Sequence, residues 1–317
     1  MSTSLPSAAQ VGSSPIRPAP VLTAESPTGR AATGKDPDSH KHAGEQASSL
    51  RAVDDADRRR GCKAVRGREE SCVEVIEQHE IAEADHRILN PFTHGKLMLL
   101  GEVCRLGRMQ RQLDLACGKG EMLARWAQRF GISGVGVDIS DVFVDAARRR
   151  ADELGVADRL EFVEADAGGY EAEPGSFDVV SCIGATWIGG GLAGTLELMR
   201  RPLRAGGLLL VGEPFWHEPP PEEAFVALEC GPDDFTSLGG ILDRFDAAGL
   251  ELIEMVLADG DSWDRYVAAQ WWTIDRWIGG HRDDPRAEEM HDLLVAWRRA
   301  HLEYGRRYLG WGVFVLR

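Results

Sequence analysis

Four acidic side chains lie at or near the ends of short apolar runs in the middle of the chain. Asp114 lies within the first run, and Asp138 and Asp166 end the second and third. Glu213 ends the fifth run. Carboxylates can accept hydrogen bonds from ribose hydroxyls, from an ammonium group or from donors on a base edge. We therefore expect the four residues to line one site for a nucleotide-like molecule.

A turn with two glycines connects the first apolar run to a helical pattern, in the stretch RQLDLACGKGEMLA over residues 111–124. The pattern predicts a buried strand, a tight turn and the first turn of a helix. Gly118 and Gly120 suit positions where the backbone has a positive φ or a ligand comes close. The free amides at the start of a helix favour an acidic group, which again fits a nucleotide-like cofactor.

Each acidic residue has a chemical use in such a site. Asp138 is placed to accept both ribose hydroxyls, and Asp166 with the amide of Ala167 can bind an adenine edge. Asp114 and the backbone of residues 116–118 would meet the ammonium and carboxylate of an amino-acid-like tail. A single aspartate at the end of a strand often only caps a helix, so the prediction depends on their joint occurrence.

From residue 111 onward, short apolar runs alternate with amphipathic helices, which is typical of a parallel sheet with helices on both faces. In such sheets ligands bind beyond the carboxyl ends of the strands, where the strand order reverses. We predict helices over residues 121–130, 140–154 and 235–248, and a further helix ending at Arg201. The predicted strands are 112–117, 134–139, 159–165, 177–183, 207–211, 251–257 and 309–316.

The composition divides the chain into two parts. Residues 1–50 hold six of the fifteen prolines, and all 23 aromatic residues lie from Phe92 onward. We therefore predict a disordered tail and charged linker over residues 1–70 and one folded domain over 71–317. Within the domain, residues 71–110 form an N-terminal helical cover, with Thr93 capping its second helix, and residues 262–304 form a helical insertion.

The net charge of −15 limits the kinds of molecule that the protein can bind. Such a field repels phosphate backbones and anionic bilayers, which favours a cationic or neutral small molecule over nucleic acid or a membrane. The alternative is that acidity only keeps the protein soluble. The six cysteines lack paired spacing and the histidines lack metal-type spacing, so we predict a reduced, cytoplasmic protein without a metal. No run of apolar residues reaches the roughly 18 residues of a membrane span. The sequence says nothing of oligomeric state.

Five segments resemble the motifs of class I S-adenosylmethionine-dependent methyltransferases. They are LDLACGKG (113–120), GVDIS (136–140), EADAGGY (164–170), FDVVSCIGAT (177–186) and LRAGGLLLVGEP (203–214). The resemblance implies a Rossmann-like, doubly wound α/β fold. Its seven-stranded, mostly parallel sheet would have the last strand antiparallel and the helical insertion before that strand. Together HRILNPF, GATWIGGG and GEPFW resemble a small bacterial subgroup of this class.

The resemblance also implies which residues hold S-adenosyl-L-methionine. They are Asp114, Ala116, Gly118, Gly120, Asp138, Ile139, Asp166, Ala167 and Ile183. One departure is Ala116, where many members of the class have a glycine. Two alternatives remain: a non-catalytic or regulatory cofactor-binding protein on the same fold, and an NAD(P)-dependent oxidoreductase. The second lacks support because the third glycine of the dinucleotide fingerprint is absent after Gly120.

Methyl transfer from a sulfonium is an in-line displacement, so alignment of the reacting groups supplies much of the rate. Where the acceptor carries a proton, a nearby carboxylate or histidine would help. Glu213 is the first candidate and His217 the second, although Glu213 can instead cap a turn. Trp187, Trp216 and His86 are candidates for contacting the substrate, and wall packing is the alternative for the two indoles.

The end of the fourth predicted strand lacks the Asn/Asp-Pro-Pro-aromatic element that amino-methylating DNA enzymes have. The sequence also lacks the pair of glutamates in one loop that would suggest a protein-arginine methylation site. We therefore predict a small-molecule acceptor, whose identity and acceptor atom the sequence does not reveal. In the insertion, apolar residues recur at helical spacing, which usually marks a packed face. Trp271 and Trp272 are adjacent and cannot share that face, so one of them lines either a substrate pocket or a subunit contact, or is simply buried.

Overall fold

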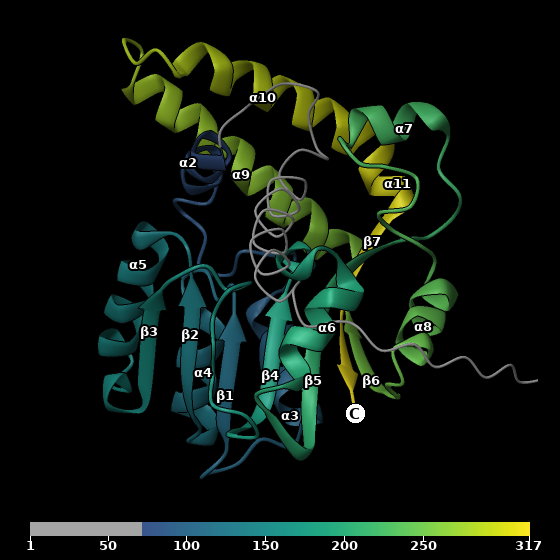
Figure 1. Cartoon of the computed structure of the whole chain (residues 1–317). Coiled ribbons are helices and arrows are strands. Elements are labelled where there is room, and N and C mark those ends of the chain that lie inside the picture. Colours follow the sequence, from purple (N-terminus) through teal and green to yellow (C-terminus); the bar gives the residue numbers. More distant parts are fainter. Residues whose placement is uncertain (1–71) are drawn as a thin grey trace, which may run out of the picture. The chain divides into compact units, whose positions relative to one another are not determined.

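The computed structural model describes residues 72–317, so the predicted tail and linker over residues 1–70 lie outside the described residues. A seven-stranded sheet in the order β3-β2-β1-β4-β5-β7-β6 forms the centre (Figure 1). The strands are β1 (Arg111–Leu115), β2 (Ser133–Asp138), β3 (Leu160–Glu164), β4 (Phe177–Ile183), β5 (Leu203–Trp216), β6 (Leu252–Leu257) and β7 (Leu309–Leu316). The predicted doubly wound α/β class is confirmed.

Strands β1 to β5 run parallel, whereas β7 pairs antiparallel with both β5 and β6. Leu113 of β1 pairs with Val135 on one side and with Val180 on the other. The strand order therefore reverses between β1 and β4, which makes the carboxyl ends of these strands the expected ligand edge. The last strand is antiparallel, as the resemblance implied.

Helices cover both faces of the sheet and the edge beyond the strand ends (Figure 1). They are α2 (Cys72–Ala82), α3 (His94–Val103), α4 (Glu121–Phe130), α5 (Asp141–Glu153), α6 (Leu192–Arg200), α7 (Glu222–Ala227), α8 (Leu238–Ala247), α9 (Gly260–Gly280), α10 (Ala287–Ala300) and α11 (Arg306–Tyr308). The side chains of Thr93 and Ser140 cap α3 and α5 by accepting from the third amide beyond each, which confirms both predicted caps.

Each face of the sheet has its own apolar core. On one face, Trp126 of α4 and Ala147 of α5 are buried with side chains of the strands. On the other face, Leu196 of α6 and Phe245 of α8 are buried. Fully burying a large apolar side chain contributes roughly 1.5–3 kcal/mol, so these faces fix the helices on the sheet.

Several boundaries differ from the predicted ones. Strand β5 starts at Leu203 and continues to Trp216, because residues 212–216 pair with β7 through Trp216–Leu309. The apolar spacing predicts that the helix capped by Thr93 runs through Leu106, whereas α3 ends at Val103, because Arg105 has a φ of 52° that does not continue a helix. Helix α8 starts only at Leu238, after the capping side chain of Ser237. Each difference depends on pairing or capping that apolar spacing does not encode.

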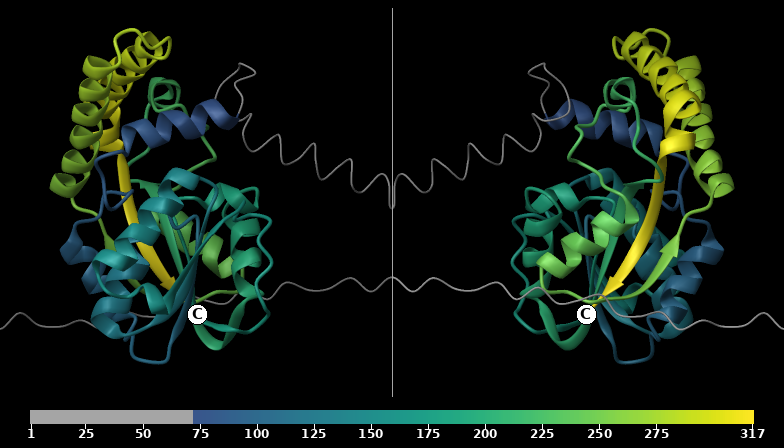
Figure 2. Two further views of the ribbon diagram at one scale, coloured as in Figure 1. Left: turned by 90° about the vertical axis from the view of Figure 1, so that its left-hand side faces the viewer. Right: turned by 90° about the vertical axis from the view of Figure 1, so that its right-hand side faces the viewer.

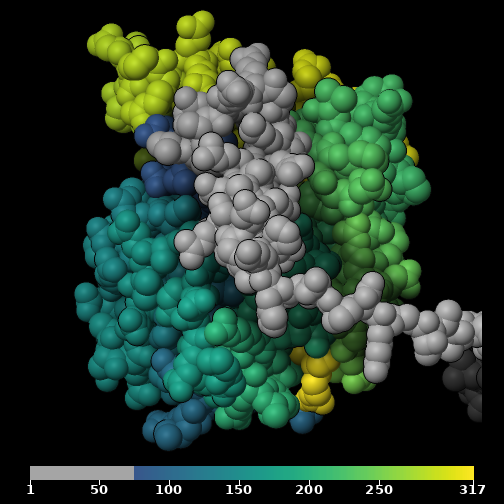
Figure 3. All heavy atoms as spheres, in the orientation of Figure 1, coloured from purple at the N-terminus to yellow at the C-terminus, as the bar shows by residue number. Residues whose placement is uncertain are grey.

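The helical insertion is formed by α9 and α10, which are followed by a π-helical turn over His301–Gly305, α11 and β7. Helix α9 starts with a capping box, in which the carboxylate of Asp259 accepts from the amide of Ser262 and the hydroxyl of Ser262 accepts from the amide of Asp259. In the space-filling view the yellow-green residues of this insertion stand at the top, above the teal residues (Figure 3).

Candidate functional site

The turn between β1 and α4 has the backbone geometry that its glycines predicted. Gly118 has a φ of 53° and Gly120 one of 63°. A Cβ at Gly118 would lie 2.6 Å from Cδ1 of Leu89, and a Cβ at Gly120 would lie 2.6 Å from Cε1 of Phe162. Both positions therefore require glycine for conformation and for space. The turn lies at the carboxyl end of β1, and both glycines are buried there.

Ala116, in the same turn, also has a left-handed backbone, with a φ of 55°. A non-glycine residue in this region is unfavourable by roughly 1–2 kcal/mol. The turn thus has a left-handed residue at this position without a glycine, which strains the backbone locally.

Asp138 ends β2 beside this turn and is buried. Its Oδ2 accepts from the amide of Gly118 at 2.7 Å, and its Oδ1 accepts from the amide of Ser140 at 3.0 Å. Burial raises the pKa of Asp138, while these two amides oppose the rise. Each carboxylate oxygen keeps a further lone pair, so Asp138 can still accept two hydroxyl hydrogen bonds.

Asp114 lies within β1 and is also buried. Its Oδ1 accepts from the hydroxyl of Ser181 on β4 at 2.6 Å. Burial raises the pKa of Asp114 to about 7, the Ser181 hydroxyl lowers it, and the nearby charge of Asp138 raises it again. The two predicted carboxylates are therefore close enough to influence each other, and a cation placed between them would be favoured.

The ends of β3 and β4 bring further predicted residues to this edge. The amide of Ala165 donates to the carbonyl of Asp138, which places Asp166 one residue beyond that contact. Asp166 is exposed and accepts from the amide of Gly168. Ala167 is buried next to it, and Ile183 ends β4 half-buried. On the β2 side, Ile139 exposes 56% of its surface, so an apolar side chain borders the site.

Glu213 lies on β5 and is buried, at 5% exposure. The hydroxyl of Thr186, just after β4, donates to its carboxylate, but burial outweighs that bond and raises the pKa of Glu213 to about 7. The thiol of Cys182 on β4 is acted on by both Asp114 and Glu213, whose charges add to the rise that burial causes in its pKa. Trp187 follows Thr186 and is 66% exposed.

The other predicted substrate and base residues have different surroundings. Trp216 is buried edge-on to Phe225 and Phe235, with ring centroids 5.8 and 5.6 Å away. Its indole nitrogen has no hydrogen-bond partner in the described part of the chain. Packing thus explains the position of Trp216. His217 is exposed and packs edge-on to Phe215 at 5.1 Å.

His86 follows helix α2 and contacts helix α9. Its Nε2 is 3.2 Å from the carbonyl of Tyr266. Its Nδ1 lies 3.3 Å from the carboxylate of Glu83 but has no hydrogen-bond partner among the described residues. A substrate contact by His86 stays a prediction, as do the roles of Trp216, His217 and Trp187.

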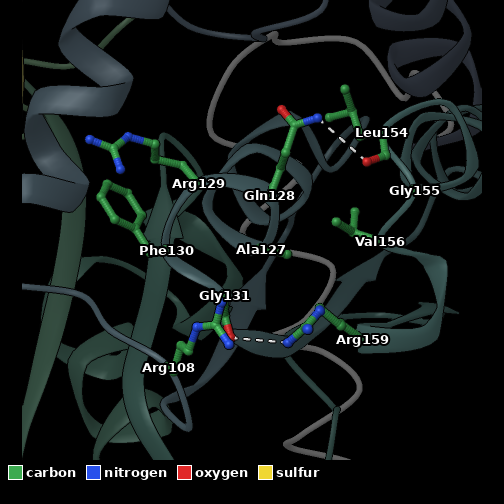
Figure 4. Close-up of a pocket in the computed structure, with 10 residues that line it drawn as sticks. All are labelled: Arg108, Ala127, Gln128, Arg129, Phe130, Gly131, Leu154, Gly155, Val156 and Arg159. Carbon is green, nitrogen blue, oxygen red and sulfur yellow. Dashed lines mark hydrogen bonds between the residues drawn. The ribbon is translucent and has the colours of Figure 1, made fainter.

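A cavity of about 280 Å³ lies at the opposite end of the sheet, beyond the carboxyl ends of α4 and α5 (Figure 4). Two guanidinium groups of this cavity contact the end of α4. Arg159 donates to the carbonyl of Gly131 at 3.2 Å, and Arg129 lies over the ring of Phe130. Within residues 72–317, no group of three or more histidine, cysteine or carboxylate side chains could hold a metal ion. In the same range, no helix is long and apolar enough to cross a membrane.

The comparisons with known proteins agree with this geometry. A family model described as a methyltransferase domain matches residues 113–207. A crystal structure of an S-adenosylmethionine-dependent methyltransferase from Geobacter sulfurreducens, in complex with S-adenosyl-L-homocysteine, is 46% identical in sequence with a TM-score of 0.74. The similarity covers 76% of this chain and 97% of that chain.

This chain belongs to the S-adenosylmethionine-dependent methyltransferases.

Two further relatives are similar to this methyltransferase over the same extent. An S-adenosylmethionine-dependent methyltransferase from Thiobacillus denitrificans, also crystallised with S-adenosyl-L-homocysteine, is 43% identical with a TM-score of 0.73, over 79% of this chain and 99% of that one. The uncharacterized protein YjhP of Escherichia coli K12 is 46% identical over 74% of this chain and 96% of its own. The predicted family, enzyme class and cofactor are thereby confirmed.

Sequence reasoning missed a second set of polar residues next to the turn of the methyltransferase. Lys119 lies between the two glycines, and its ammonium reaches the end of helix α2. Glu83, at that end, is fully buried and binds Tyr266 and Gln270 of α9. The position of Lys119 inside the turn was a usable signal, whereas Glu83 and Tyr266 are 183 positions apart and carry no shared motif.

Proposed function

We propose that this methyltransferase binds S-adenosyl-L-methionine across the carboxyl ends of β1 to β4 and transfers its methyl group to a small-molecule acceptor. The observation that carries the proposal is the bond between the Gly118 amide and Asp138, which joins the glycine turn to the β2 carboxylate. The complexes of the Geobacter and Thiobacillus relatives with S-adenosyl-L-homocysteine support a site for this cofactor.

The residues at the end of β2 fit the adenosine part of the cofactor. Asp138 keeps lone pairs for the two ribose hydroxyls, although both of its oxygens already accept from backbone amides. Ile139 presents an exposed apolar side chain suited to one face of the adenine. Asp166 and the amide of Ala167 are proposed to bind the adenine edge, as acceptor and donor respectively.

The residues of β1 and the turn fit the methionine part. Asp114 is a buried carboxylate that accepts from the Ser181 hydroxyl, and burial raises its pKa to about 7. An ammonium group would supply a positive charge and favour the ionised form. The positive-φ backbone at Ala116, Gly118 and Gly120 is proposed to lie next to the cofactor's carboxylate. Ile183, at the end of β4, is proposed to border the site.

When bound, S-adenosyl-L-methionine supplies a methyl group on a positively charged sulfur. We propose Glu213 as the group that accepts a proton from the acceptor, because its pKa of about 7 balances the two protonation states near neutral pH. Thr186 orients this carboxylate through its hydroxyl. His217 is the second candidate, and it is exposed while its ring packs edge-on to Phe215.

The acceptor is proposed to be a cationic or neutral small molecule. The net charge of −15 and the buried carboxylates of Asp114 and Glu213 disfavour an anionic acceptor. The exposed indole of Trp187 beside Thr186 offers a face to a cation. His86 and Trp216 remain further proposed substrate contacts.

Transfer of tritium from methyl-labelled S-adenosyl-L-methionine to a fractionated metabolite extract tests this function. We expect label in a small-molecule fraction with the wild-type protein and none with Asp138→Ala. Cofactor binding without transfer to any fraction would instead favour a non-catalytic role. Comparing Glu213→Gln with wild type on the labelled fraction then tests the proton acceptor, for which we expect a decrease of about 10²- to 10⁴-fold.

A further inference from the structure

Helices α2, α9 and α10 share an apolar core that is separate from the cores on the two faces of the sheet. Ala82 of α2 and Ile274 of α9 are fully buried in it. The remaining members are Met290, Leu293 and Leu294, with Ile81, Trp271, Trp277, Ile278 and Trp297 packed against them. We call these three helices the helical lid, which lies above the ends of the strands (Figure 2).

The helical lid joins the predicted cover and the predicted insertion, which the sequence presents as two separate segments. Its base is fixed, because Trp263 in the first turn of α9 packs with the core of the sheet. By contrast, the lid contacts the glycine turn and the end of β2 through polar groups. Glu80 of α2 accepts from the hydroxyl of Ser140 at 2.6 Å, two residues beyond Asp138.

Lys119 makes the main polar contact between the turn and the lid. Its ammonium donates to the carbonyls of Glu83, Ala84 and His86 at 2.7, 2.9 and 2.9 Å. An ammonium has three donors, so this contact uses them all and satisfies carbonyls just after the end of α2. Burial lowers the pKa of Lys119, and the charge of Glu83 opposes that effect.

Glu83 carries the connection onward to α9. Its side chain has no exposed surface and accepts from the hydroxyl of Tyr266 at 2.5 Å and the amide of Gln270 at 2.6 Å. Burial raises the pKa of Tyr266, and the charge of Glu83 raises it further, so the phenol stays a donor. The end of α2 is therefore held by the turn from below and by α9 from above.

We infer that Lys119 is a positioning residue that couples the cofactor turn to the helical lid. Because Lys119 lies between Gly118 and Gly120, the lid and the turn share one set of hydrogen bonds. A closed lid then holds the turn in its binding conformation, and a ligand on the turn stabilises the closed lid. The coupling rests on the proposed function, in which this turn binds the cofactor.

The substitution Lys119→Met tests the coupling, since it keeps the length of the side chain and removes its donors. We measure S-adenosyl-L-homocysteine affinity by calorimetry, and hydrogen exchange of residues 75–90 and 263–280 with and without that ligand. We expect at least about fivefold weaker binding. We also expect faster exchange in both segments, and a loss of the protection that the ligand gives the wild-type lid.

Lys96→Met is the matched control. Lys96 donates to the carbonyl of Leu257 and pairs with Asp259, the N-cap of α9, so it contacts the base of the lid without contacting the turn. We expect its ligand affinity to stay within about twofold of wild type. Tyr266→Phe is the second variant and removes only the hydroxyl bond to Glu83. We expect it to weaken ligand binding and speed hydrogen exchange of the lid less than Lys119→Met does. It carries the test if Lys119→Met does not fold.

Two results would overturn the coupling. One is unchanged ligand affinity in Lys119→Met and Tyr266→Phe. The other is faster exchange of the lid without any change in its response to ligand, which would make Lys119 purely structural. Asp138→Asn separates this failure from that of the proposed function: if Asp138→Asn loses binding and Lys119→Met does not, only the coupling is wrong, whereas normal binding by Asp138→Asn contradicts the site itself.

Discussion

At the scale of single residues, the site contains two buried carboxyl groups, Asp114 and Glu213, whose neighbours stabilise the charged form only in part. For Glu213 these neighbours include the charge of Arg244. Asp114 and Glu213 accept one hydroxyl bond each, which does not offset the free energy of burying a charge. Their pKa values therefore rise to about 7. A positively charged ligand would reverse this balance, which is the residue-level reason to place an ammonium or a sulfonium here.

The raised pKa of Asp114 predicts a pH-dependent effect of Asp114→Asn on stability. The folded protein binds this proton more tightly than the unfolded chain does, so the associated stability is present at low pH and is lost as pH rises through about 7. Asparagine has no such loss. We expect the stability of Asp114→Asn relative to wild type to increase by about 2 kcal/mol between about pH 5.5 and pH 8, measured by urea unfolding.

Asp275→Asn, at an exposed carboxylate of α9, is the control and should follow wild type across the same range. A constant difference between Asp114→Asn and wild type at every pH would show that Asp114 does not titrate in this interval.

The strained backbone of Ala116 predicts that Ala116→Gly is stabilising. Glycine removes the steric conflict at a φ of 55°, while its larger freedom in the unfolded chain offsets part of the gain. We expect a net gain of about 0.5–1 kcal/mol in the free energy of unfolding. Ala127→Gly, within helix α4, should instead lose about 1 kcal/mol. Equal losses in both variants would mean that Ala116 is not strained.

At the scale of elements, the sheet and the helices of its two faces were predictable, because alternation of apolar runs and amphipathic helices is a local pattern. The caps at Thr93 and Ser140 were predictable for the same reason. The end of β5 was not, since its pairing with β7 joins Trp216 to Leu309, far along the chain. The sequence also could not show that α2 packs with α9 and α10, because the apolar face of a helix does not determine which other helix it packs against.

The separate core of the helical lid predicts a local effect of Ile274→Ala. Ile274 has no exposed surface, so its truncation should weaken lid packing by about 2–5 kcal/mol. We expect faster hydrogen exchange in α2 and α10, with little change in β4. Ile253→Ala, on β6 with 37% exposure, is the matched control and should change the lid little. An increase in the hydrogen-exchange rate of β4 as large as the increase in α10 would show that the lid is not a separate unit.

At the scale of the whole molecule, residues from both ends of the described chain meet over one edge of the sheet. The strands supply the carboxylates and the glycine turn, while the helical lid supplies a cover with its own core. Of the two adjacent indoles, Trp271 packs against that core, whereas Trp272 is 66% exposed. The cofactor's class followed from local motifs, whereas the lid depends on contacts between distant segments.

The central claim is that Asp138 and the glycine turn together hold the adenosine and methionine parts of one cofactor. Calorimetric titration of S-adenosyl-L-homocysteine into wild type and Asp138→Asn tests it most directly. We expect wild type to bind one molecule per chain and Asp138→Asn to bind about 100-fold more weakly, because the side-chain NH2 of asparagine cannot accept a hydrogen bond and the negative charge is lost. Equal affinity in two folded proteins would contradict the claim.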